Sequence, residues 1–375
     1  MKPRSAFAQI SLLTVLLAGR LCAQSVAPEG KNEPSPPSTV AASQTVAASD
    51  PRFSYEGRFD FSDTDGVVVI WQASRIALDF EGDSVGLLFD DAKGQCFFNA
   101  EVNGTNTVIE IREGSGPQPS TLTGLGKGRH HLELFKRSEA DAGTVRFHGV
   151  VVPKMSRAWR SKSPKYKSRM EFIGDSITVG ACDEDGDTDQ WDNRRTHNAA
   201  LSYATLTAEA LDADYRNIAV SGMGISIGWV EPRAAEIWDR LYPSPQSPRA
   251  QLTNWIPDIV FINLGENDDS FPKAHELAFP TNYTERYVAL IHAIRAAYPR
   301  AQIVLLRGGM FGGAKSDELR IAWESAVTQL EATDRAISHF VFSRWSNNHP
   351  RVSDHRLMAD ELIAWLKANK PIQLR

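Results

Sequence analysis

The second half of the chain, from Arg169 onward, alternates short apolar runs with longer stretches in which apolar residues recur at helical spacing. Short runs of this kind are typical of buried strands, and the longer stretches are typical of amphipathic helices. Ser353, followed by an acid, suits the N-cap of the last helix. Strands that alternate with helices form a parallel sheet covered on both faces, so this half is predicted to be an α/β domain. The predicted strands begin near residues 169, 214, 257, 301 and 338, and the predicted helices cover about 199–212, 283–298, 316–333 and 353–369.

Residues 51–155 show a different pattern, in which short runs are separated by turns rich in Gly, Asp and Asn. Polar and apolar residues alternate with period two in "VIEIR" (108–112) and "HLELF" (131–135). This alternation is typical of strands with one buried face. Strands at this spacing, without helical stretches between them, predict a β-sandwich of the jelly-roll kind. We therefore place a sandwich at 51–155 and the α/β domain at 156–375.

The N-terminus has the features of a signal peptide. Lys2 and Arg4 precede the apolar stretch "ISLLTVLLAG" (10–19), and Ala23 offers a small residue at a cleavage point. The apolar stretch is too short to span a bilayer comfortably, and no second one follows. We therefore expect residues 1–23 to be removed and the mature protein to be secreted or periplasmic, without a membrane span.

Cys22 raises a lipoprotein anchor as an alternative, although the bulky Leu21 stands where a small residue is expected before a lipidated cysteine. Residues 24–50 are rich in Pro, Ser and Ala and are predicted to be a disordered linker.

Composition and charge limit the classes of function. The chain has 375 residues, 42% of them hydrophobic, which favours two domains over one core. A net charge of −5 argues against a nucleic-acid-binding protein, because such proteins need a basic surface to meet phosphates. Cys96 and Cys182 could form a disulfide between the domains in an oxidising compartment, or could both remain free thiols. The cysteine spacing is not that of a metal site.

Polar motifs follow four of the five predicted strands. The motif Gly174-Asp175-Ser176 follows the first strand, and "SGMG" (221–224) follows the second. "GEND" (265–268) follows the third strand, and "NNHP" (347–350) follows the last. Each motif alone is commonly a turn or a helix cap. Because the carboxyl ends of parallel strands meet at one edge of a sheet, their joint occurrence predicts a site there.

Together these motifs supply the groups that acyl transfer needs. Ser176 is a weak nucleophile until a base takes its proton, and His349 can be that base. The backbone N–H groups of Ser176 and Gly222 and the side-chain amide of Asn267 can donate to the oxyanion of a tetrahedral intermediate. We therefore predict Ser176 and His349 as catalytic residues, and Ser176, Gly222 and Asn267 as the oxyanion hole.

The motifs "GDSIT", "SGMG", "GEND" and "HP" resemble the four sequence blocks of the SGNH (GDSL-type) hydrolases over about residues 169–369. The resemblance implies a flavodoxin-like three-layer fold and assigns the same roles to the same four residues. In that family the acid beside the nucleophile usually shapes its turn, so we give Asp175 a supporting role, and Asp268 likewise.

The order of the domains, a β-sandwich ahead of an SGNH domain, resembles carbohydrate esterase family 2. So does the wording of "FIGDSIT", "NIAVSGMG" and "FINLGEND". These enzymes are exported acetyl esterases that act on polysaccharides such as xylan and glucomannan. The resemblance implies a serine esterase that removes O-acetyl groups from carbohydrates through an acetyl-enzyme, without a metal or other cofactor, and we expect a monomer.

One position departs from the SGNH pattern, in which an aspartate three residues before the histidine commonly orients the imidazole. Here that position is Ser346, and no carboxylate lies between Ser343 and His349. Loss of the orienting acid costs about 10⁴ in rate in a serine protease. The partner that we favour is a backbone carbonyl within residues 345–347. The alternatives are a side-chain oxygen of Ser346 or Asn347, a distant acid such as Asp268 or Asp354, and a weakened site that lacks an orienting group.

Several other residues were candidates for the site. His355 is a rival base, but its place within the last predicted helix favours a helical surface pair with the neighbouring acid. Trp345 and Trp191 are predicted to form sugar-stacking walls, with Trp229 as a weaker candidate, although aromatic residues are more common in cores. The acidic loop 183–195 lacks the spacing of a calcium-binding loop and is predicted to be a solvated loop at the cleft rim.

Two alternatives to a polysaccharide acetyl esterase remain open. One is an esterase of the same superfamily that acts on lipids or on acetylated cell-wall glycan. The other is a non-catalytic carbohydrate-binding protein, with the sandwich as its binding part.

Overall fold

The structure is a computed structural model that describes residues 43–114, 119–162 and 164–369. The predicted signal peptide (1–23), with Cys22, lies outside the described residues, as does the part of the predicted linker before residue 43. Of the helices in the described part of the chain, none is both long and apolar enough to cross a membrane.

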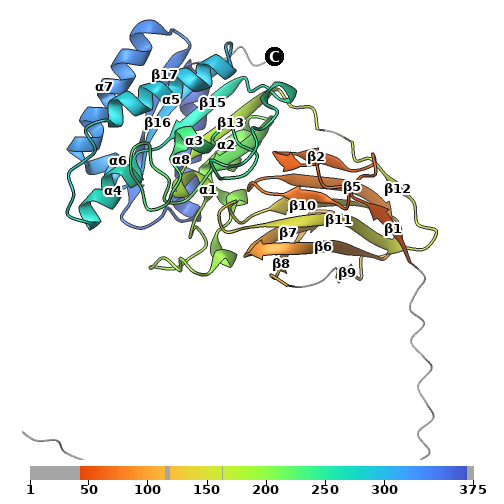
Figure 1. The fold of residues 1–375 in the computed structure, drawn as a ribbon. Coiled ribbons are helices and arrows are strands. Elements are labelled where there is room, and N and C mark those ends of the chain that lie inside the picture. Colours follow the sequence, from red (N-terminus) through yellow and green to blue (C-terminus); the bar gives the residue numbers. More distant parts are fainter. Residues whose placement is uncertain (1–42, 115–118, 163, 370–375) are drawn as a thin grey trace, which may run out of the picture. The chain divides into compact units, whose positions relative to one another are not determined.

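The N-terminal half forms two antiparallel sheets around one apolar core (Figure 1), which confirms the predicted sandwich. Alternate side chains of a strand point inward, as Ile76, Leu78 and Phe80 do in the second sheet. The first sheet has the order β3-β4-β11-β6-β9, with β1 paired to β11: β1 (Ser43–Ala47), β3 (Phe59–Asp60), β4 (Val67–Val69), β6 (Ser84–Gly94), β9 (Ser120–Thr123) and β11 (Gly143–Pro153). The second sheet has the order β12-β5-β10-β7-β8, with β2 paired to β5: β2 (Ser54–Glu56), β5 (Arg75–Glu81), β7 (Cys96–Val102), β8 (Thr105–Ile111), β10 (Arg129–Lys136) and β12 (Ala158–Trp159).

The sandwich is longer than predicted at both ends. β1 pairs along its whole length with β11, so residues 43–47 belong to the sandwich and not to the predicted linker. β12 pairs with β5, beyond the boundary predicted at residue 155. The pattern did not reveal β1 because Val46 is its only large apolar residue; that side chain is buried.

The C-terminal half contains a five-stranded parallel sheet of order β14-β13-β15-β16-β17. This is the flavodoxin-like order, in which the first strand lies between the second and the third. The carboxyl end of β13 is therefore the switch point at which ligands bind in such sheets. The strands are β13 (Ser168–Gly174), β14 (Ala213–Ala219), β15 (Ile259–Asn263), β16 (Gln302–Met310) and β17 (Ile337–Ser346).

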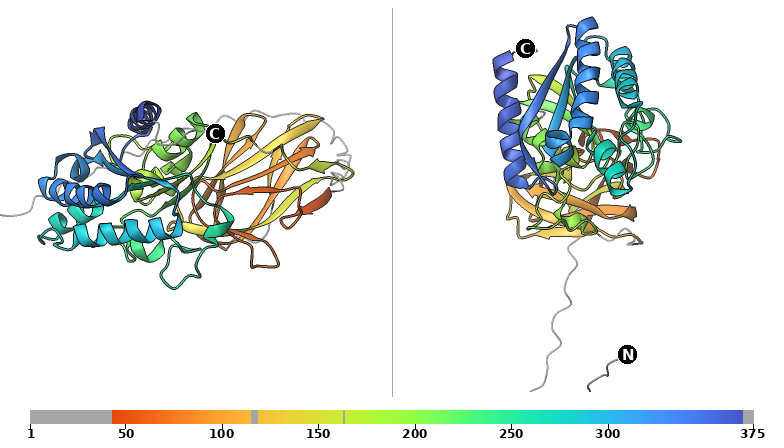
Figure 2. Two further views of the ribbon diagram at one scale, coloured as in Figure 1. Left: turned by 90° about the horizontal axis from the view of Figure 1, so that it is seen from above. Right: turned by 90° about the vertical axis from the view of Figure 1, so that its left-hand side faces the viewer.

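Helices cover both faces of this sheet, which gives the three predicted layers (Figures 1 and 2). Alternate residues of a strand face opposite sides, so Val260 of β15 packs in the cluster that contains α5 and α7. Its neighbour Phe261 packs in the cluster that contains α2 and α8. The helices are α1 (Ser176–Val179), α2 (Tyr203–Ala210), α3 (Ala234–Ile237), α4 (Glu266–Ala274), α5 (Tyr283–Ala297), α6 (Phe311–Lys315), α7 (Asp317–Thr333) and α8 (Val352–Asn369), with 3₁₀ turns at Arg194–Thr196, Ala199–Leu201 and Leu252–Asn254.

The four predicted helices correspond to α2, α5, α7 and α8. Ser353 lies inside α8, which begins at Val352, so its assignment as the N-cap is wrong. α4 was not among the predicted helices; its sequence "ENDDSFPKA" is polar and contains Pro272.

Side chains of the sandwich reach into the α/β domain. Arg58 Nη2 pairs with Oε1 of the buried Glu171 at 3.1 Å, and Gln72 Nε2 donates to the Ala219 carbonyl at 2.9 Å. Trp71 belongs to the apolar cluster on one face of the parallel sheet. The two halves therefore share part of a core.

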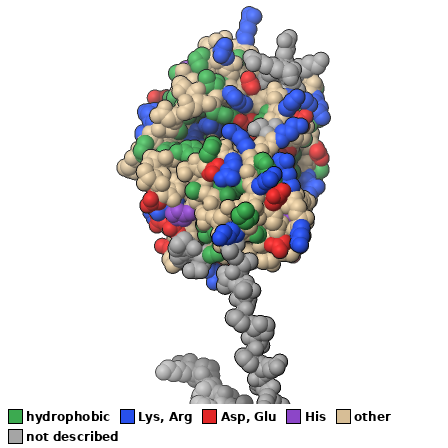
Figure 3. All heavy atoms as spheres, turned by 90° about the vertical axis from the view of Figure 1, so that its right-hand side faces the viewer, with side chains coloured by type: hydrophobic (Ala, Val, Ile, Leu, Met, Phe, Trp, Pro, Cys, Tyr) green, Lys and Arg blue, Asp and Glu red, His purple; other side chains and the backbone are tan. Residues whose placement is uncertain are grey.

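Charges of both signs are mixed on the surface. On the face drawn in Figure 3, Lys and Arg side chains lie among Asp and Glu side chains. Exposed ion pairs contribute little to stability, so the fold depends mainly on its apolar clusters.

Candidate active site

A pocket of about 470 Å³ at the carboxyl edge of the parallel sheet is lined by all four residues assigned to catalysis, Ser176, Gly222, Asn267 and His349. Small-molecule sites typically measure roughly 300–1,000 Å³. The pocket is therefore large enough for a small ester or part of a sugar.

The nucleophile turn is held by its two neighbours. Ser176 is the first residue of α1, and Oδ1 of Asp175 caps this helix by accepting from the Ile177 N–H at 3.1 Å. Gly174 is required because a Cβ there would lie 2.1 Å from Oγ1 of Thr178. Ser176 lines the pocket although it is only 4% exposed, so the turn buries everything except the face that meets the pocket.

Asp175 ties this turn to α4. Burial raises the pKa of Asp175 well above its usual value, and the nearby carboxyl groups of Glu266 and Asp268 raise it further. Nδ2 of Asn267 donates to Asp175 Oδ2 at 3.2 Å. These contacts fit the supporting role assigned to Asp175.

Gly222 occupies a position that only glycine fills without strain. Its φ is 79°, and a Cβ would approach Cβ of Trp229 to 3.0 Å. Its carbonyl accepts from the Trp229 N–H at 2.9 Å. Among the described residues, its own N–H has no hydrogen-bond acceptor, so this donor is available to a ligand in the pocket.

Asp268 organises the loop that follows Gly222. Its carboxylate accepts hydrogen bonds from the N–H groups of Ile225, Ser226 and Ile227 at 2.8, 2.6 and 3.0 Å. Burial raises the pKa of Asp268 to about 6, against the effect of these three donors. Asp268 thus supports the loop of Gly222 and is not the partner of His349.

Asn267 is the second residue of α4 and is buried against the pocket. Its Nδ2 also donates to the Met223 carbonyl at 2.9 Å. The amide therefore lies between the turn that carries Ser176 and the loop that carries Gly222.

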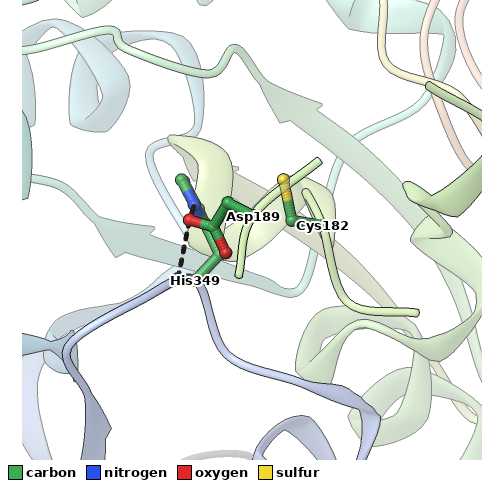
Figure 4. Close-up of side chains that lie close together, drawn as sticks. All are labelled: Cys182, Asp189 and His349. Carbon is green, nitrogen blue, oxygen red and sulfur yellow. Dashed lines mark hydrogen bonds and ion pairs between the residues drawn. The ribbon is translucent and has the colours of Figure 1, made fainter. Parts of the chain in front are cut away.

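The imidazole of His349 is oriented by Asp189. Nδ1 of His349 lies 2.7 Å from Asp189 Oδ2, and the His349 N–H donates to the same oxygen at 3.4 Å (Figure 4). Burial opposes ionisation of Asp189, but hydrogen bonds from His349 and Arg351 outweigh it and hold its pKa below the usual range. Asp189 therefore accepts from Nδ1–H, which leaves Nε2 as the basic nitrogen.

The favoured backbone-carbonyl partner is therefore wrong. Loop 183–195 is largely exposed and meets the pocket at Trp191, as predicted for a solvated rim, but its Asp189 also belongs to the site. Asp354 is also excluded, because it binds Nε of Arg344 at 2.6 Å and the Arg351 N–H at 3.0 Å. Ser346 is the last residue of β17 and pairs in the sheet with Met310.

Arg351 joins the two loops that meet at the histidine. Its Nη1 donates to Asp189 Oδ1 at 2.8 Å, to the Cys182 carbonyl at 2.9 Å and to the His349 carbonyl at 3.1 Å. Its Nε donates to the Gly186 carbonyl at 2.8 Å. The guanidinium of Arg351 thus fixes Asp189 and the loop of His349 relative to each other.

His355 is buried inside α8 and is not a surface residue as predicted. Its Nδ1 accepts from the Tyr203 N–H at 3.2 Å, and burial lowers its pKa to about 3. It lines no part of the pocket and is a neutral core histidine.

Of the three candidate tryptophans, Trp191 and Trp229 line the pocket and Trp345 does not, which differs from the prediction. Trp191 lines the pocket and stacks on His349, with ring centroids 5.4 Å apart. Trp229 also lines the pocket, and its Nε1 donates to Ser270 Oγ at 3.1 Å. Trp345 does not line the pocket; it packs edge-on against Phe311.

Two family models match the chain. "Carbohydrate esterase 2 N-terminal" matches residues 55–161, and "GDSL-like Lipase/Acylhydrolase family" matches residues 172–361. A family two carbohydrate esterase from Clostridium thermocellum, solved with cellohexaose, is 30% identical and has a TM-score of 0.75, with 85% of this chain and 99% of that chain covered. The chain belongs to carbohydrate esterase family 2.

Two further members of the family are named for their activities. The cellulase/esterase CelE of Acetivibrio thermocellus is 32% identical over 87% of this chain, which spans only 40% of CelE. An acetylxylan esterase / glucomannan deacetylase of Cellvibrio japonicus is 28% identical over 80% of this chain and 86% of that protein.

The two cysteines of this family 2 esterase that the structure describes are both free, so the interdomain disulfide does not form. Cys96 lies in the sandwich core. In the described part of the chain, one group could offer metal ligands: Cys182, Asp189 and His349 place ligand atoms within 4.8 Å of one another (Figure 4). Burial and the neighbouring acids Asp189 and Asp185 raise the pKa of the Cys182 thiol, which disfavours the thiolate that metals bind.

Asp189 is the residue of this family 2 esterase that sequence reasoning missed. One signal was present: the loop that contains it follows the nucleophile strand and so begins at the same sheet edge as the histidine loop. Several acids compete in "DEDGDTDQWD" (183–192), and only the fold selects the one that Arg351 and His349 bind.

Proposed function

We propose that this protein is a serine esterase that removes O-acetyl groups from carbohydrates. The observation that carries the proposal is the pocket in which Ser176, the free N–H of Gly222, Asn267 and the Asp189–His349 pair meet. A nucleophile, an oriented base and preorganised donors are together what acyl transfer requires.

In the first half-reaction, Oγ of Ser176 attacks the acetyl carbonyl carbon while Nε2 of His349 takes its proton. The N–H groups of Ser176 and Gly222 donate to the oxyanion, and Asn267 turns one N–H from Asp175 toward it. Asp189 stabilises the imidazolium. The bond between the acetyl carbon and the sugar oxygen then breaks, and the proton on Nε2 passes to that oxygen.

In the second half-reaction, a water molecule gives its proton to Nε2 and attacks the acetyl-enzyme carbon. The same donors hold the second oxyanion. The bond to Oγ of Ser176 breaks, Oγ recovers its proton from Nε2, and acetic acid leaves and gives its own proton to water to become acetate.

The substrate class is supported by the relative from Cellvibrio japonicus, which is named an acetylxylan esterase / glucomannan deacetylase, and by the solved complex of a relative with cellohexaose. Trp191 and Trp229, 37% and 51% exposed, flank the pocket of this chain. Their faces suit the apolar side of a pyranose ring.

The decisive experiment compares the natural protein with Ser176→Ala on 4-nitrophenyl acetate and on acetylated xylan and glucomannan. We expect kcat to fall by about 10⁵–10⁶ in the variant, as in other serine hydrolases. Ser325→Ala, an exposed serine of α7, is the matched control and should keep full activity. Unchanged hydrolysis in Ser176→Ala would exclude Ser176 as the nucleophile.

The same assay separates the alternatives. Faster turnover of long-chain than of acetyl esters would favour a lipase-like enzyme, and glycan binding without any turnover would favour a carbohydrate-binding protein.

We also propose that the protein is exported and monomeric. Export is supported by the charge and apolar pattern of residues 1–23. Sequencing of the mature N-terminus after expression with its own leader tests it: a terminus at residue 24 supports export, and a lipid on Cys22 supports the anchored alternative. Light scattering of the purified protein measures the oligomeric state.

A further inference from the structure

The loop between β10 and β11 carries a segment of the sandwich toward the active site. We call residues 136–140 the bridging segment. Nζ of the fully buried Lys136 donates to the carbonyls of Ser138 and Glu139 at 2.9 and 3.1 Å. The Ala140 N–H donates to Oε1 of Gln72 at 3.1 Å. These bonds fix the backbone of the segment from within the sandwich.

Glu139 projects from this segment and contacts both sides of the site. Its side chain is 1% exposed. Oε2 accepts from the Ser221 N–H at 2.9 Å, and Oε1 pairs with Nη1 of Arg194 at 3.0 Å. A buried carboxylate with two such partners is a strong orienting group, because few other arrangements satisfy its charge.

Ser221 and Arg194, the two closest partners of Glu139, each connect it to a group of the proposed mechanism. Ser221 precedes Gly222, so the bond to its N–H restrains the chain that presents the oxyanion donor. The guanidinium carbon of Arg194 lies 4.3 Å from the ring centroid of Trp191, and this ring stacks on His349. Glu139 is thus linked to the oxyanion donor through one contact, with Ser221, and to the base through three contacts in series, by way of Arg194 and Trp191.

A second residue of the bridging segment holds the loop that carries Asp189. Nη2 of Arg137 donates to the Arg195 carbonyl at 2.8 Å and pairs with Glu184. The Arg137 carbonyl accepts from the Ala199 N–H at 3.0 Å. The segment therefore contacts loop 183–195 near both of its ends.

We propose that Glu139 is a positioning residue of the esterase site, through which the sandwich fixes the oxyanion donor of Gly222 and the Trp191–His349 stack relative to each other. The inference rests on the proposed function. It makes the α/β domain incomplete as a catalyst without the sandwich, since no group of the α/β domain takes the place of this carboxylate among the described contacts of Ser221.

The test compares Glu139→Ala, Glu139→Gln and Glu171→Gln in the full chain, with kcat and KM for 4-nitrophenyl acetate and the melting temperature as readouts. Glu171 is the matched control, because it is a buried carboxylate that also joins the two domains, through Arg58, but does not line the pocket. We expect Glu139→Ala to lose about 10–10² in kcat with KM nearly unchanged, as for a weakened oxyanion donor. Glu139→Gln keeps an acceptor for the Ser221 N–H and should recover part of the loss. Glu171→Gln should melt at a lower temperature and keep kcat within about threefold.

The possible outcomes separate the two proposals. If Glu139→Ala and Glu139→Gln keep kcat within twofold, or if Glu171→Gln loses as much kcat as they do, the positioning role is overturned while the esterase assignment stands. If the natural protein hydrolyses no ester, the proposed function itself fails. Should Glu139→Ala not fold, Glu139→Gln and the shorter Glu139→Asp decide: normal kcat in both rejects the role, and loss of kcat at unchanged KM supports it.

Discussion

The active site has two sides that are built in different ways. The oxyanion side, with Gly222, Asn267 and Asp268, consists of the residues that directly follow β14 and β15, the neighbours of β13 in the sheet. Its carboxylate is fully buried and is bound by three backbone N–H groups. The histidine side joins Asp189 to His349, whose side chains are 25% and 15% exposed, across 160 residues of sequence.

The two sides of the site therefore depend on different features of the fold. Hydrogen bonds from the side chain of one short motif to the backbone of the next form wherever the strand order brings the two motifs together. A loop-to-loop contact between charged side chains forms only if both loops have the right length and a third group holds them, here Arg351. We therefore expect the histidine side to be more sensitive in catalysis to a single substitution, and the oxyanion side to be more sensitive in stability.

The largest effect is expected on the histidine side. In Asp189→Asn the Nδ1–H acceptor is weakened and the wrong tautomer becomes accessible, so kcat should fall by about 10³–10⁴. Asp187→Asn is the control, because Asp187 meets the histidine loop only through its carbonyl, which accepts from Asn348. If kcat of Asp189→Asn falls by less than tenfold, Asp189 does not orient His349, and a backbone carbonyl becomes the favoured partner again.

The pH dependence of stability adds a second measurement on this side. The pKa of Asp189 is lower in the folded chain than its usual value of 3.8, so the folded state binds this proton more weakly than the unfolded state. The contribution of Asp189 to the free energy of unfolding is therefore fully present at pH values above its usual pKa. It is lost as the pH falls below that value. In urea unfolding between pH 3 and pH 6, the free energy of unfolding should fall less steeply with decreasing pH in Asp189→Asn than in the natural protein.

An intermediate effect on catalysis is expected on the oxyanion side. Asp268→Asn places an NH₂ group against backbone donors, which leaves at least one buried N–H unpaired and should cost about 1–3 kcal/mol of unfolding free energy. The loop of Gly222 would shift, and we expect about a tenfold loss of kcat, in line with a misplaced oxyanion donor. Asp269→Asn on the same helix is the control, because its partners Ser316 and Lys273 lie outside that loop. Equal losses of kcat in the two variants would mean that Asp268 has no specific part in positioning.

The smallest effect on activity is expected at His355. In His355→Gln the side-chain oxygen can still accept from the Tyr203 N–H, so kcat at pH 7 should stay within about threefold of the natural value. The pKa of His355 is lowered to about 3, so the unfolded chain binds this proton first and stability falls as the pH drops from 6.5 toward 3. The variant should lose less stability over that range in urea titrations. A large loss of kcat would identify His355 as the base.

The predicted site residues that the structure brings together at the pocket share one property: each belongs to a short motif that follows a strand. Ser176, Gly222 and Asn267 needed only the strand order to meet. The partner of His349 could not be predicted, because several acids of loop 183–195 have similar neighbours in sequence. Trp345 was misplaced for a related reason, since adjacency to the histidine motif does not tell which way a side chain points from β17.

Arg351 has a consequence for how other sequences are interpreted. Because it binds the acid and the histidine loop together, the acid of the triad is free to come from a different part of the chain, provided that the arginine is kept two residues after the histidine. A search that requires an aspartate three residues before the histidine would count this chain as a dyad or as inactive. In this chain the acid that binds the histidine instead comes from the loop after the nucleophile motif, 160 residues earlier in the sequence.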